Sequence, residues 1–311
     1  MKKIFILSLS ALLAALMVTG CASKQKADAP TQKKNVIYVS REGFSKNLIE
    51  IVYEPTAERD SAFAKASADN PVDLWAFGIA QTEVTYTHWY EVYSWAIING
   101  YTFANPGREG SDGEDGAEPK NTDLPVTMIS WRDAVVWCNA ASEREGLKPV
   151  YKYNGEVLKT SDNATEGEGK AENAIVDTNA NGYRLPTEAE WEFAARGGNP
   201  ESENWAKAYG VADETPDALA WYSDNSEDKA HEVQTKAENA FGLYDMNGNV
   251  WEWCYNAWTS SNQRRAMRGG SYRKNAAGVT SVSRDYAPVT KKYDDVGFRV
   301  VRRENSQREA K

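Results

Sequence analysis

The sequence predicts a mixed fold, with helices in the first two thirds of the chain and short strands joined by long loops after residue 198. Three segments combine a helix start signal with apolar residues at helical spacing. Beyond Gly198 short apolar or aromatic stretches alternate with Asn, Gly, Asp and Ser, which is typical of short strands and ordered loops. The 311 residues suffice for one large domain or two small ones.

The first predicted helix follows Thr85 and runs to about Ile98, because Thr is a good N-cap and Gly100 lies just beyond the end. In the second, Ser130 is the cap and Asp133 occupies the third position. Its expected apolar stripe consists of Ala134, Val135, Cys138 and Ala141, and Gly146 ends it.

The third helix has the strongest start signal, since Thr187 and Glu190 form a capping box and Gly197-Gly198 follow the helix.

The N-terminus resembles an export signal. Lys2 and Lys3 precede an apolar run over residues 4–18, which is too short to span a bilayer. The run ends in Val18-Thr19-Gly20-Cys21, which resembles a lipoprotein lipobox, so we predict a signal peptide over residues 1–20 and lipidation of Cys21. The alternative is an ordinary signal peptide that happens to contain a cysteine.

After cleavage the chain would be exported and lipid-anchored, at the outer membrane or the cell surface. Residues 21–34 would form a flexible tether, residues 35–303 a single domain and residues 304–311 a tail. The mature chain would carry 34 basic and 45 acidic residues, a net charge of −11. This charge argues against binding of nucleic acid or anionic lipid, which attract basic surfaces.

Two further cysteines, Cys138 and Cys254, leave two interpretations open. In an exported protein they could pair as a disulfide. Both lie among apolar or aromatic neighbours, which favours buried free thiols that act as small hydrophobic side chains.

A series of ordered motifs spans residues 72–302. They are Gln81-Thr82-Glu83-Val84-Thr85, Leu124-Pro125-Val126, Gly182-Tyr183-Arg184-Leu185-Pro186-Thr187-Glu188, Ala194-Ala195-Arg196-Gly197-Gly198, Gly248-Asn249-Val250-Trp251-Glu252-Trp253, Arg268-Gly269-Gly270-Ser271-Tyr272 and Gly297-Phe298-Arg299. The series resembles the formylglycine-generating enzyme (sulfatase-modifying factor) family. The resemblance implies a single α+β domain of the C-type-lectin-like kind, rich in loops and low in regular secondary structure. Arg184 and Arg299 would then be buried donors to loop carbonyls or to Glu188 and Glu192.

The same resemblance argues against the family's enzymatic activity. Family enzymes carry two copper-binding cysteines after the Gly-Gly-Ser-aromatic motif, where this chain has Lys274 and Val279, and Cu(I) needs thiolate ligands. An iron site, known from another branch, needs several histidines, and this chain has only His88 and His231. We therefore expect no copper, no iron and no catalysis.

Calcium is the one metal that the resemblance implies. Carried over by position, its ligands would be the carboxylates of Asp245 and Glu252 and the carbonyls of Gly248 and Val250, in a structural role. The alternative is that both carboxylates only accept backbone hydrogen bonds in a tight turn.

The segment of about residues 253–295 also resembles the lipid-anchored treponemal variable proteins of diversity-generating retroelements. Between family-like anchors it contains Tyr, Asn, Asp, Ser, Gly and Arg, the mixture that antibody paratopes use. The predicted contact residues are Tyr255, Asn256, Arg273, Lys274, Asn275, Ala277, Gly278, Asp285, Tyr286, Ala287, Tyr293, Asp294 and Asp295.

Three functions follow from these observations. The first is a surface-displayed, non-catalytic lipoprotein whose diversified C-terminal loops bind a protein or glycan ligand at the cell surface. The second is a non-catalytic envelope accessory protein with a fixed surface. The third is an enzyme with unrecognised chemistry, which the missing thiols disfavour.

Overall fold

The computed structural model describes residues 48–51, 77–120, 122–161, 169–197, 209, 215–260 and 262–303. These residues belong to one compact unit, Asn35–Lys311. The predicted signal peptide, Cys21, the tether and the C-terminal tail lie outside the described residues. Within the described ranges no helix has the length and apolar character needed to cross a membrane.

All three predicted helices are present, and each starts at the predicted cap. They are α2 (Tyr86–Ile98), α3 (Trp131–Arg144) and α4 (Glu188–Ala195), and a short α5 (Pro216–Leu219) was not predicted. The Thr85 side chain accepts a hydrogen bond from the backbone N–H of His88. Capping boxes begin α3 and α4, so the local sequence signals were sufficient to place these starts.

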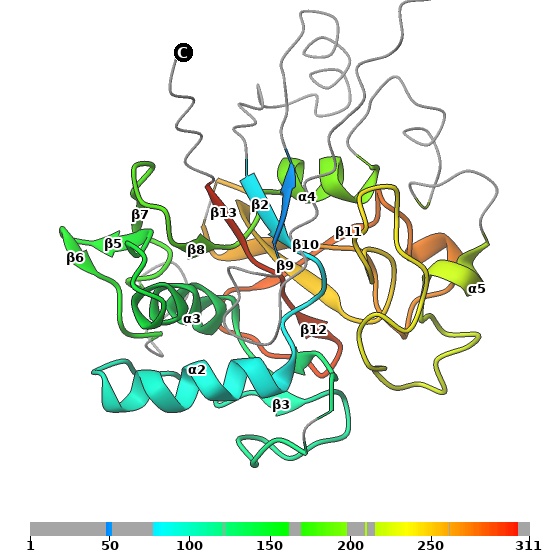
Figure 1. The fold of residues 1–311 in the computed structure, drawn as a ribbon, viewed down its shortest axis with the longest axis horizontal. Coiled ribbons are helices and arrows are strands. Elements are labelled where there is room, and N and C mark those ends of the chain that lie inside the picture. The colour runs from blue at the N-terminus through cyan, green and yellow to red at the C-terminus, as the bar shows by residue number, and fades with distance from the viewer. Residues whose placement is uncertain are drawn as a thin grey trace, which may run out of the picture. The chain divides into compact units, whose positions relative to one another are not determined.

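Within the described ranges, short strands form two four-stranded sheets and two smaller ones (Figure 1). The first sheet has the order β1 (Leu48–Ile51), β2 (Phe77–Ala80), β13 (Val301–Arg303), β8 (Tyr183–Arg184). The second has the order β11 (Arg284–Pro288), β10 (Arg264–Arg268), β9 (Trp251–Ala257), β12 (Val296–Gly297). The smaller sheets pair β3 (Arg108–Glu109) with β4 (Val126–Thr127), and β5 (Tyr151–Tyr153) with β6 (Glu156–Val157) and β7 (Ile175–Val176). This mixture of helices and short strands confirms the predicted α+β class.

Helix α3 forms the centre of the core. It packs against α2, β5 and β8, and its residues 131–142 are all buried, so the predicted apolar stripe was too narrow. The polar side chains of α3 have partners within the core. Arg132 pairs with Glu172 at 2.5 Å, and the Asp133 carboxylate accepts hydrogen bonds from the backbone N–H groups of Ala104 and Ser130. A helix surrounded by protein can be buried all round only when its polar groups find such partners.

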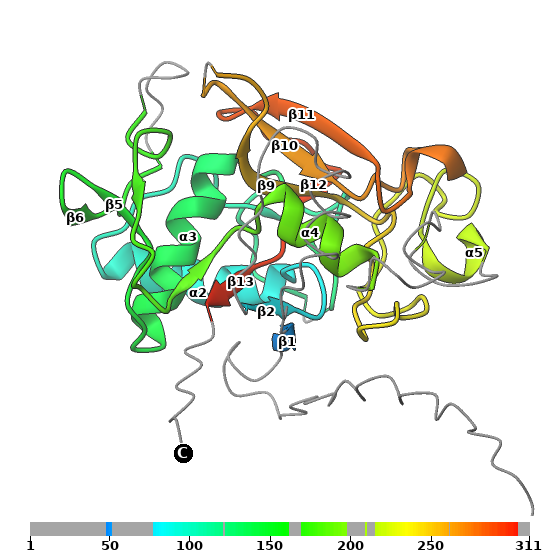
Figure 2. The ribbon, with the colours of Figure 1, turned by 90° about the horizontal axis from the view of Figure 1, so that it is seen from above.

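Buried aromatic rings join the helices to the C-terminal strands. Trp89 of α2 stacks on Trp137 of α3 at 5.9 Å between ring centroids, and the edge of Phe298 meets both rings. Cys138 and Cys254 are buried free thiols, which confirms the favoured interpretation. Helix α4 packs against β9 and β10 and so supports the second sheet (Figure 2).

Candidate functional site

The predicted contact residues follow a turn of two glycines at the end of β10. Gly269 and Gly270 have φ values of 94° and 86°, where residues with a Cβ are strained. A Cβ on Gly270 would also lie 2.3 Å from the carbonyl oxygen of Gly278. The glycine pair therefore lets the loop 271–279 fold back closely against the end of the sheet.

The two positions that the resemblance assigns to catalytic cysteines have opposite environments. Val279 is completely buried and packs with Ala220 and Tyr222. The Lys274 side chain is 43% exposed, with its ammonium 3.9 Å from a carboxylate oxygen of Asp285 and 5.6 Å from the ring centroid of Trp251. One position thus holds the loop in place and the other presents a charge to solvent.

Arg273 connects this loop to the segment before β12. Its Nη2 donates to Asp294 Oδ2 at 2.9 Å, its Nε lies 3.4 Å from Asp228 Oδ1, and its guanidinium stacks over the Tyr272 ring. The hydrogen bonds to Arg273 lower the pKa of the Asp294 carboxyl. Because the pair is exposed, it orients both side chains with little effect on stability.

Asn275 and Ala277 belong to a short 3-10 helix, η3 (Ala276–Gly278), and its N-cap. The Asn275 side-chain oxygen accepts from the Gly278 N–H at 3.1 Å. Asn275 and Ala277 are exposed, while Gly278 is partly covered by Lys274. The cap therefore fixes the backbone while two side chains remain accessible.

Strand β11 alternates between solvent and core, which corrects one predicted contact residue. Tyr286 is 37% exposed and packs against Trp258 at 4.9 Å between centroids, and Asp285 is half-buried. Ala287 is only 2% exposed because successive side chains of a strand point to opposite faces. It belongs to the core and cannot contact a ligand in this conformation.

Tyr255 and Asn256 also serve as supports. The Tyr255 ring stacks on Tyr151 at 5.8 Å between centroids, and burial raises the pKa of its hydroxyl. Asn256 Oδ1 accepts from the backbone N–H of Glu188, the first residue of α4, at 2.7 Å. Both side chains are half-buried and connect β9 to its neighbours.

The predicted contact residues 293–295 also divide into exposed side chains and side chains that support the fold. Tyr293 is 38% exposed, whereas Asp295 Oδ2 accepts from the Ser271 hydroxyl at 2.8 Å and its carbonyl accepts from the Trp251 N–H. Burial raises the pKa of the Asp295 carboxyl. The exposed members of the predicted set, together with the half-buried Lys274, Asp285 and Asp294, whose side chains form ion pairs at the surface, are called the contact face. They are Arg273, Lys274, Asn275, Ala277, Asp285, Tyr286, Tyr293 and Asp294.

The predicted calcium ligands fit a cation only in part. Both Glu252 oxygens accept from Arg299, at 2.6 and 2.7 Å, and one also accepts from Trp191 Nε1. Asp245 Oδ2 accepts from the Gln234 N–H, and burial raises the pKa of this carboxyl to about 6. Gly248 and Val250 lie between them in the same loop, and among the described residues no three His, Cys, Asp or Glu form a group suited to a metal. Calcium therefore stays a prediction.

Of the two family arginines, Arg299 is a buried donor, as predicted, whereas the Arg184 side chain is 19% exposed, and their acceptors differ in part from the predicted ones. Arg299 reaches the carbonyl oxygens of Ala80 and Tyr244 as well as Glu252. Arg184 pairs with Glu190 instead of Glu188 or Glu192. Those acidic residues instead face Arg268, whose ion pair with Glu192 is 2.6 Å long.

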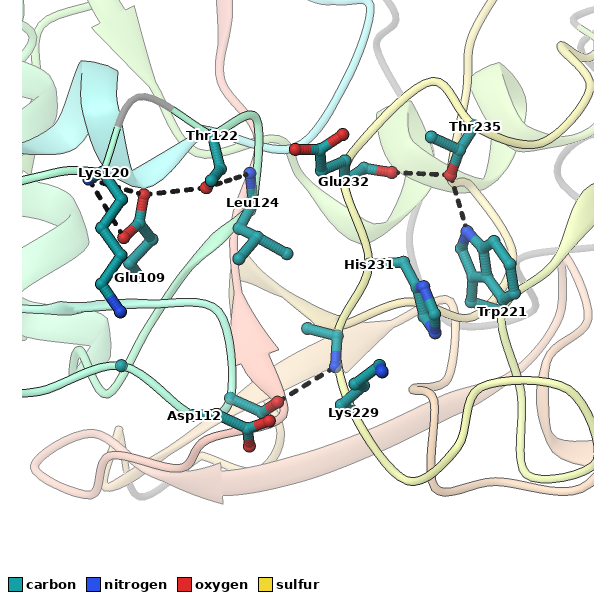
Figure 3. A pocket seen from close by; sticks show the side chains of 13 residues that line it. Glu109, Asp112, Lys120, Thr122, Leu124, Trp221, Lys229, His231, Glu232 and Thr235 are labelled. Atoms are coloured by element: carbon teal, nitrogen blue, oxygen red, sulfur yellow. Dashed lines mark hydrogen bonds between the residues drawn. The ribbon is translucent and has the colours of Figure 1, made fainter.

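A pocket of 430 Å³ was not predicted from the sequence (Figure 3). It lies between the stretches 109–124 and 221–235, and its lining includes Glu109, Lys120, Trp221 and His231. Almost no apolar residue occurs in the sequence between positions 105 and 121, so composition alone predicts a plain surface loop there. The residue that could have indicated an ordered loop at this pocket is Glu109. Its buried carboxylate accepts hydrogen bonds from the Lys120 N–H and from the Thr122 hydroxyl and so orders the loop.

The comparisons with known proteins agree with this architecture. Among curated proteins, the chaperone protein LppX of Paenibacillus barcinonensis is 32% identical over 263 residues, which cover 76% of this chain and 83% of that protein. The inactive C-alpha-formylglycine-generating enzyme 2 of Bos taurus is 37% identical over 108 residues, 31% of this chain and 35% of that protein. These names show that the family includes members without the enzymatic activity.

Two solved structures are similar over most of the chain. CarF has a TM-score of 0.64 and 33% identity, covering 77% of this chain and 90% of its own. Treponema denticola variable protein 1 has a TM-score of 0.57 and 30% identity, covering 74% and 85%. This similarity confirms the loop-rich, C-type-lectin-like α+β fold and the resemblance to treponemal variable proteins. The model of the sulfatase-modifying factor enzyme 1-like domain matches residues 46–304, and the chain therefore belongs to that family, the family of the formylglycine-generating enzyme.

Proposed function

We propose that this protein is a surface-displayed, non-catalytic lipoprotein that binds a ligand through the contact face. The observation that carries the proposal is the division within residues 271–295: Val279, Ala287 and Ser271 are buried, while Arg273, Tyr286 and their accessible neighbours are not. Loops on a rigid scaffold can change their exposed residues without loss of the fold. The similarity to the treponemal variable protein supports this use of the scaffold.

The chemistry of the contact face suits recognition of a macromolecule. Tyr286 and Tyr293 provide large amphipathic rings, and Arg273 and Asn275 provide adaptable hydrogen-bonding groups. Tyr and Arg are enriched at protein interfaces, where they contribute much of the binding energy. A protein or glycan at the cell surface is therefore the proposed partner.

Sequencing the coding region across many cells of one population tests the diversification directly. We expect substitutions at Arg273, Asn275, Tyr286 and Tyr293 and invariance at Gly270 and the other buried anchors. A near-identical template repeat and a reverse transcriptase gene should lie nearby. A contact face that is invariant in every cell would refute the diversification.

A fixed accessory role is the second candidate, and the chaperone name of the 32% identical relative favours it. A fixed partner would select for one set of contact residues. The same sequencing therefore separates the two proposals, since an invariant contact face together with an invariant set of anchors supports the accessory role.

Absence of the family's catalysis is tested separately. A peptide with a sulfatase-type cysteine motif is incubated with the protein and copper, and formylglycine is measured by mass spectrometry. Because Lys274 and Val279 lack thiols, we expect no conversion. Formation of the aldehyde would refute the non-catalytic proposal.

Lipid attachment is proposed at Cys21. Metabolic labelling with palmitate should mark the wild-type chain and partition it into membranes, whereas a Cys21→Ser variant should remain unlabelled. Equal labelling of both would place the lipid elsewhere.

Structural calcium remains a separate proposal for Asp245, Gly248, Val250 and Glu252. Glu83, Asp245 and Glu252 are buried near the Arg299 guanidinium, and burial together with the neighbouring carboxylates raises the pKa of Glu83, so a bound cation would favour the charged forms of these carboxylates. The melting temperature should rise when chelated protein receives about 2 mM calcium, near the weak end of extracellular sites. An unchanged melting temperature would contradict calcium binding.

A further inference from the structure

The pocket between residues 109–124 and 221–235 is an ordered cavity whose walls are connected to each other. The backbone N–H of Ala230 donates to the Ser111 hydroxyl at 3.1 Å, and that of Val233 donates to the Asp123 carbonyl at 3.0 Å. The volume of 430 Å³ lies within the range of small-molecule sites. All residues that line the pocket precede the segment 253–295, so diversification of that segment would leave the pocket unchanged.

His231 is held rigidly at the wall of this pocket (Figure 3). Its ring stacks on Trp221 with 3.7 Å between centroids and 11° between planes. The buried Asn249 side chain bonds both the backbone N–H and the carbonyl of His231. A polar side chain fixed from several directions beside a cavity is preorganised to contact a ligand.

The hydrogen bond made by one ring nitrogen of His231 determines which kind of group the other ring nitrogen can bind. Nε2 lies 2.8 Å from the Ser226 carbonyl oxygen, and because a carbonyl can only accept, Nε2 carries the proton. In the neutral ring Nδ1 is then a hydrogen-bond acceptor. A ligand at this position must supply a donor.

The remaining polar side chains of the pocket lining include hydrogen-bond acceptors and donors, so a ligand that pairs with them must offer both. The carboxylates of Asp112 and Glu232 are exposed acceptors, Lys120 is an exposed donor, and the Lys229 ammonium already donates to Glu227 at 2.8 Å. An anion would meet the carboxylates, a cation would meet the lysines, and an apolar ligand would satisfy none of these groups. Hydroxyl groups donate and accept at once, so they satisfy both sets.

We propose that this pocket binds a neutral, hydroxyl-rich ligand of the saccharide class. Leu124 and the edge of the Trp221–His231 stack provide apolar surface for the C–H groups of such a ring, while the Trp221 ring itself is covered by His231 and by the Lys236 ammonium, 3.9 Å from its centroid. The pocket lies beside the contact face, because Asp228, which pairs with Arg273, precedes Lys229 of the lining. The inference goes beyond the proposed function, since it requires neither diversification nor a macromolecular partner.

The test is saturation-transfer NMR and calorimetry on the full chain with glucose, galactose, mannose, N-acetylglucosamine and cellobiose, up to about 50 mM. Glycine betaine and inorganic phosphate are the cationic and anionic probes. We expect saturable binding of at least one saccharide, in the millimolar range or tighter, and no binding of either charged probe. Absence of saccharide binding, or binding of betaine or phosphate instead, would overturn the inference.

Variants assign the binding to this pocket. His231→Phe keeps a ring for the stack and removes both Nδ1 and the Nε2 hydrogen bond to Ser226, and Asp112→Asn and Glu232→Gln remove exposed charges without touching the core. Each should weaken saccharide binding about tenfold, as loss of a hydrogen bond to a charged or fixed group does. The matched control Glu238→Gln removes an exposed carboxylate outside the pocket and should bind like wild type. Unchanged binding in Asp112→Asn, Glu232→Gln and His231→Phe together would overturn the assignment. Tyr286→Ala should leave saccharide binding intact, so this result is independent of the contact face.

Discussion

The core around α3 and the contact face use ion pairs in opposite ways. Arg132 and Glu172 in the core have side-chain exposures of 1% and 0%, whereas Arg273 and Asp294 on the contact face are 41% and 32% exposed. Removal of one partner from a buried pair leaves an uncompensated charge, but water compensates the loss in an exposed pair. The comparison indicates that replacements are tolerated on the contact face because its charged groups contribute little to folding.

The buried set extends beneath the contact face itself. Glu252 of β9 pairs with Arg299 at exposures of 1% and 0%, and it lies one residue from Trp251, whose ring is near Lys274. Fixed and replaceable residues therefore lie within one short stretch of chain. A rigid support directly under accessible side chains is what a diversified surface requires.

Among the substitutions that test this comparison, Arg299→Ala should have the largest effect on the free energy of unfolding. The change leaves Glu252 buried without its partner and removes donors from the carbonyls of Ala80 and Tyr244. We expect a loss of about 3–5 kcal/mol in the free energy of unfolding, measured with urea. The matched change Arg273→Ala should cost about 1 kcal/mol or less. Similar losses in the two variants would remove the distinction between core and contact face.

The helical core should make the free energy of unfolding depend on pH. Burial beside Trp137, with a smaller effect of Arg144, lowers the pKa of His88 from 6.5 to about 3. Below pH 6.5 the unfolded chain binds a proton that the folded chain excludes, so the unfolding free energy should fall by a few kcal/mol between pH 6.5 and 3. Urea unfolding across this range measures the slope.

The variant His88→Phe should abolish this part of the slope. In His231→Phe the slope should remain, because His88 is still present. A wild-type slope in the His88 variant would show that other groups govern acid stability.

Local signals explain what the sequence could predict. Thr85, Ser130 and Thr187 determine helix starts through bonds to residues three positions later, so these starts could be placed without tertiary information. The exposed members of the contact face were also identified from composition. The β-strands are only two to seven residues long, and their pairing is largely nonlocal, so the sheet order could not be derived in the same way.

The contacts that the sequence did not predict are those between residues distant along the chain. Tyr255 resembles a paratope residue, but its ring meets Tyr151, and Asn256 bonds the start of α4. Glu252 is a predicted calcium ligand, and its oxygens also contact Arg299, 47 residues later, which the sequence did not indicate. The pocket depends on Ser111 meeting Ala230, 119 residues away, and no local pattern predicts such a contact.

Gly270→Ala should separate backbone strain from close packing. Its φ of 86° disfavours a side chain, and a Cβ would lie 2.3 Å from the Gly278 carbonyl oxygen. We expect destabilisation of roughly 2–3 kcal/mol, above the 1–2 kcal/mol of left-handed strain alone. Gly100→Ala is the control, since Gly100 has a φ of 83° and no atom within 4 Å of the added Cβ. Equal melting temperatures of the two variants would show that close approach at Gly270 contributes nothing.

Substitutions on the contact face should have the smallest effect. Tyr286→Ala and Tyr293→Ala remove rings that are 37% and 38% exposed, so the unfolding free energy should change by about 0.5 kcal/mol or less. Ala287→Tyr at the adjacent buried position should cost about 1–3 kcal/mol, because the core has no room for the ring. Urea unfolding of the Tyr286 and Ala287 variants measures whether tolerance alternates along β11, and the Tyr293 variant measures tolerance in the loop before β12. A loss above 1 kcal/mol for either exposed tyrosine would mean that its ring supports the fold, and the contact face would then be smaller than its exposure indicates.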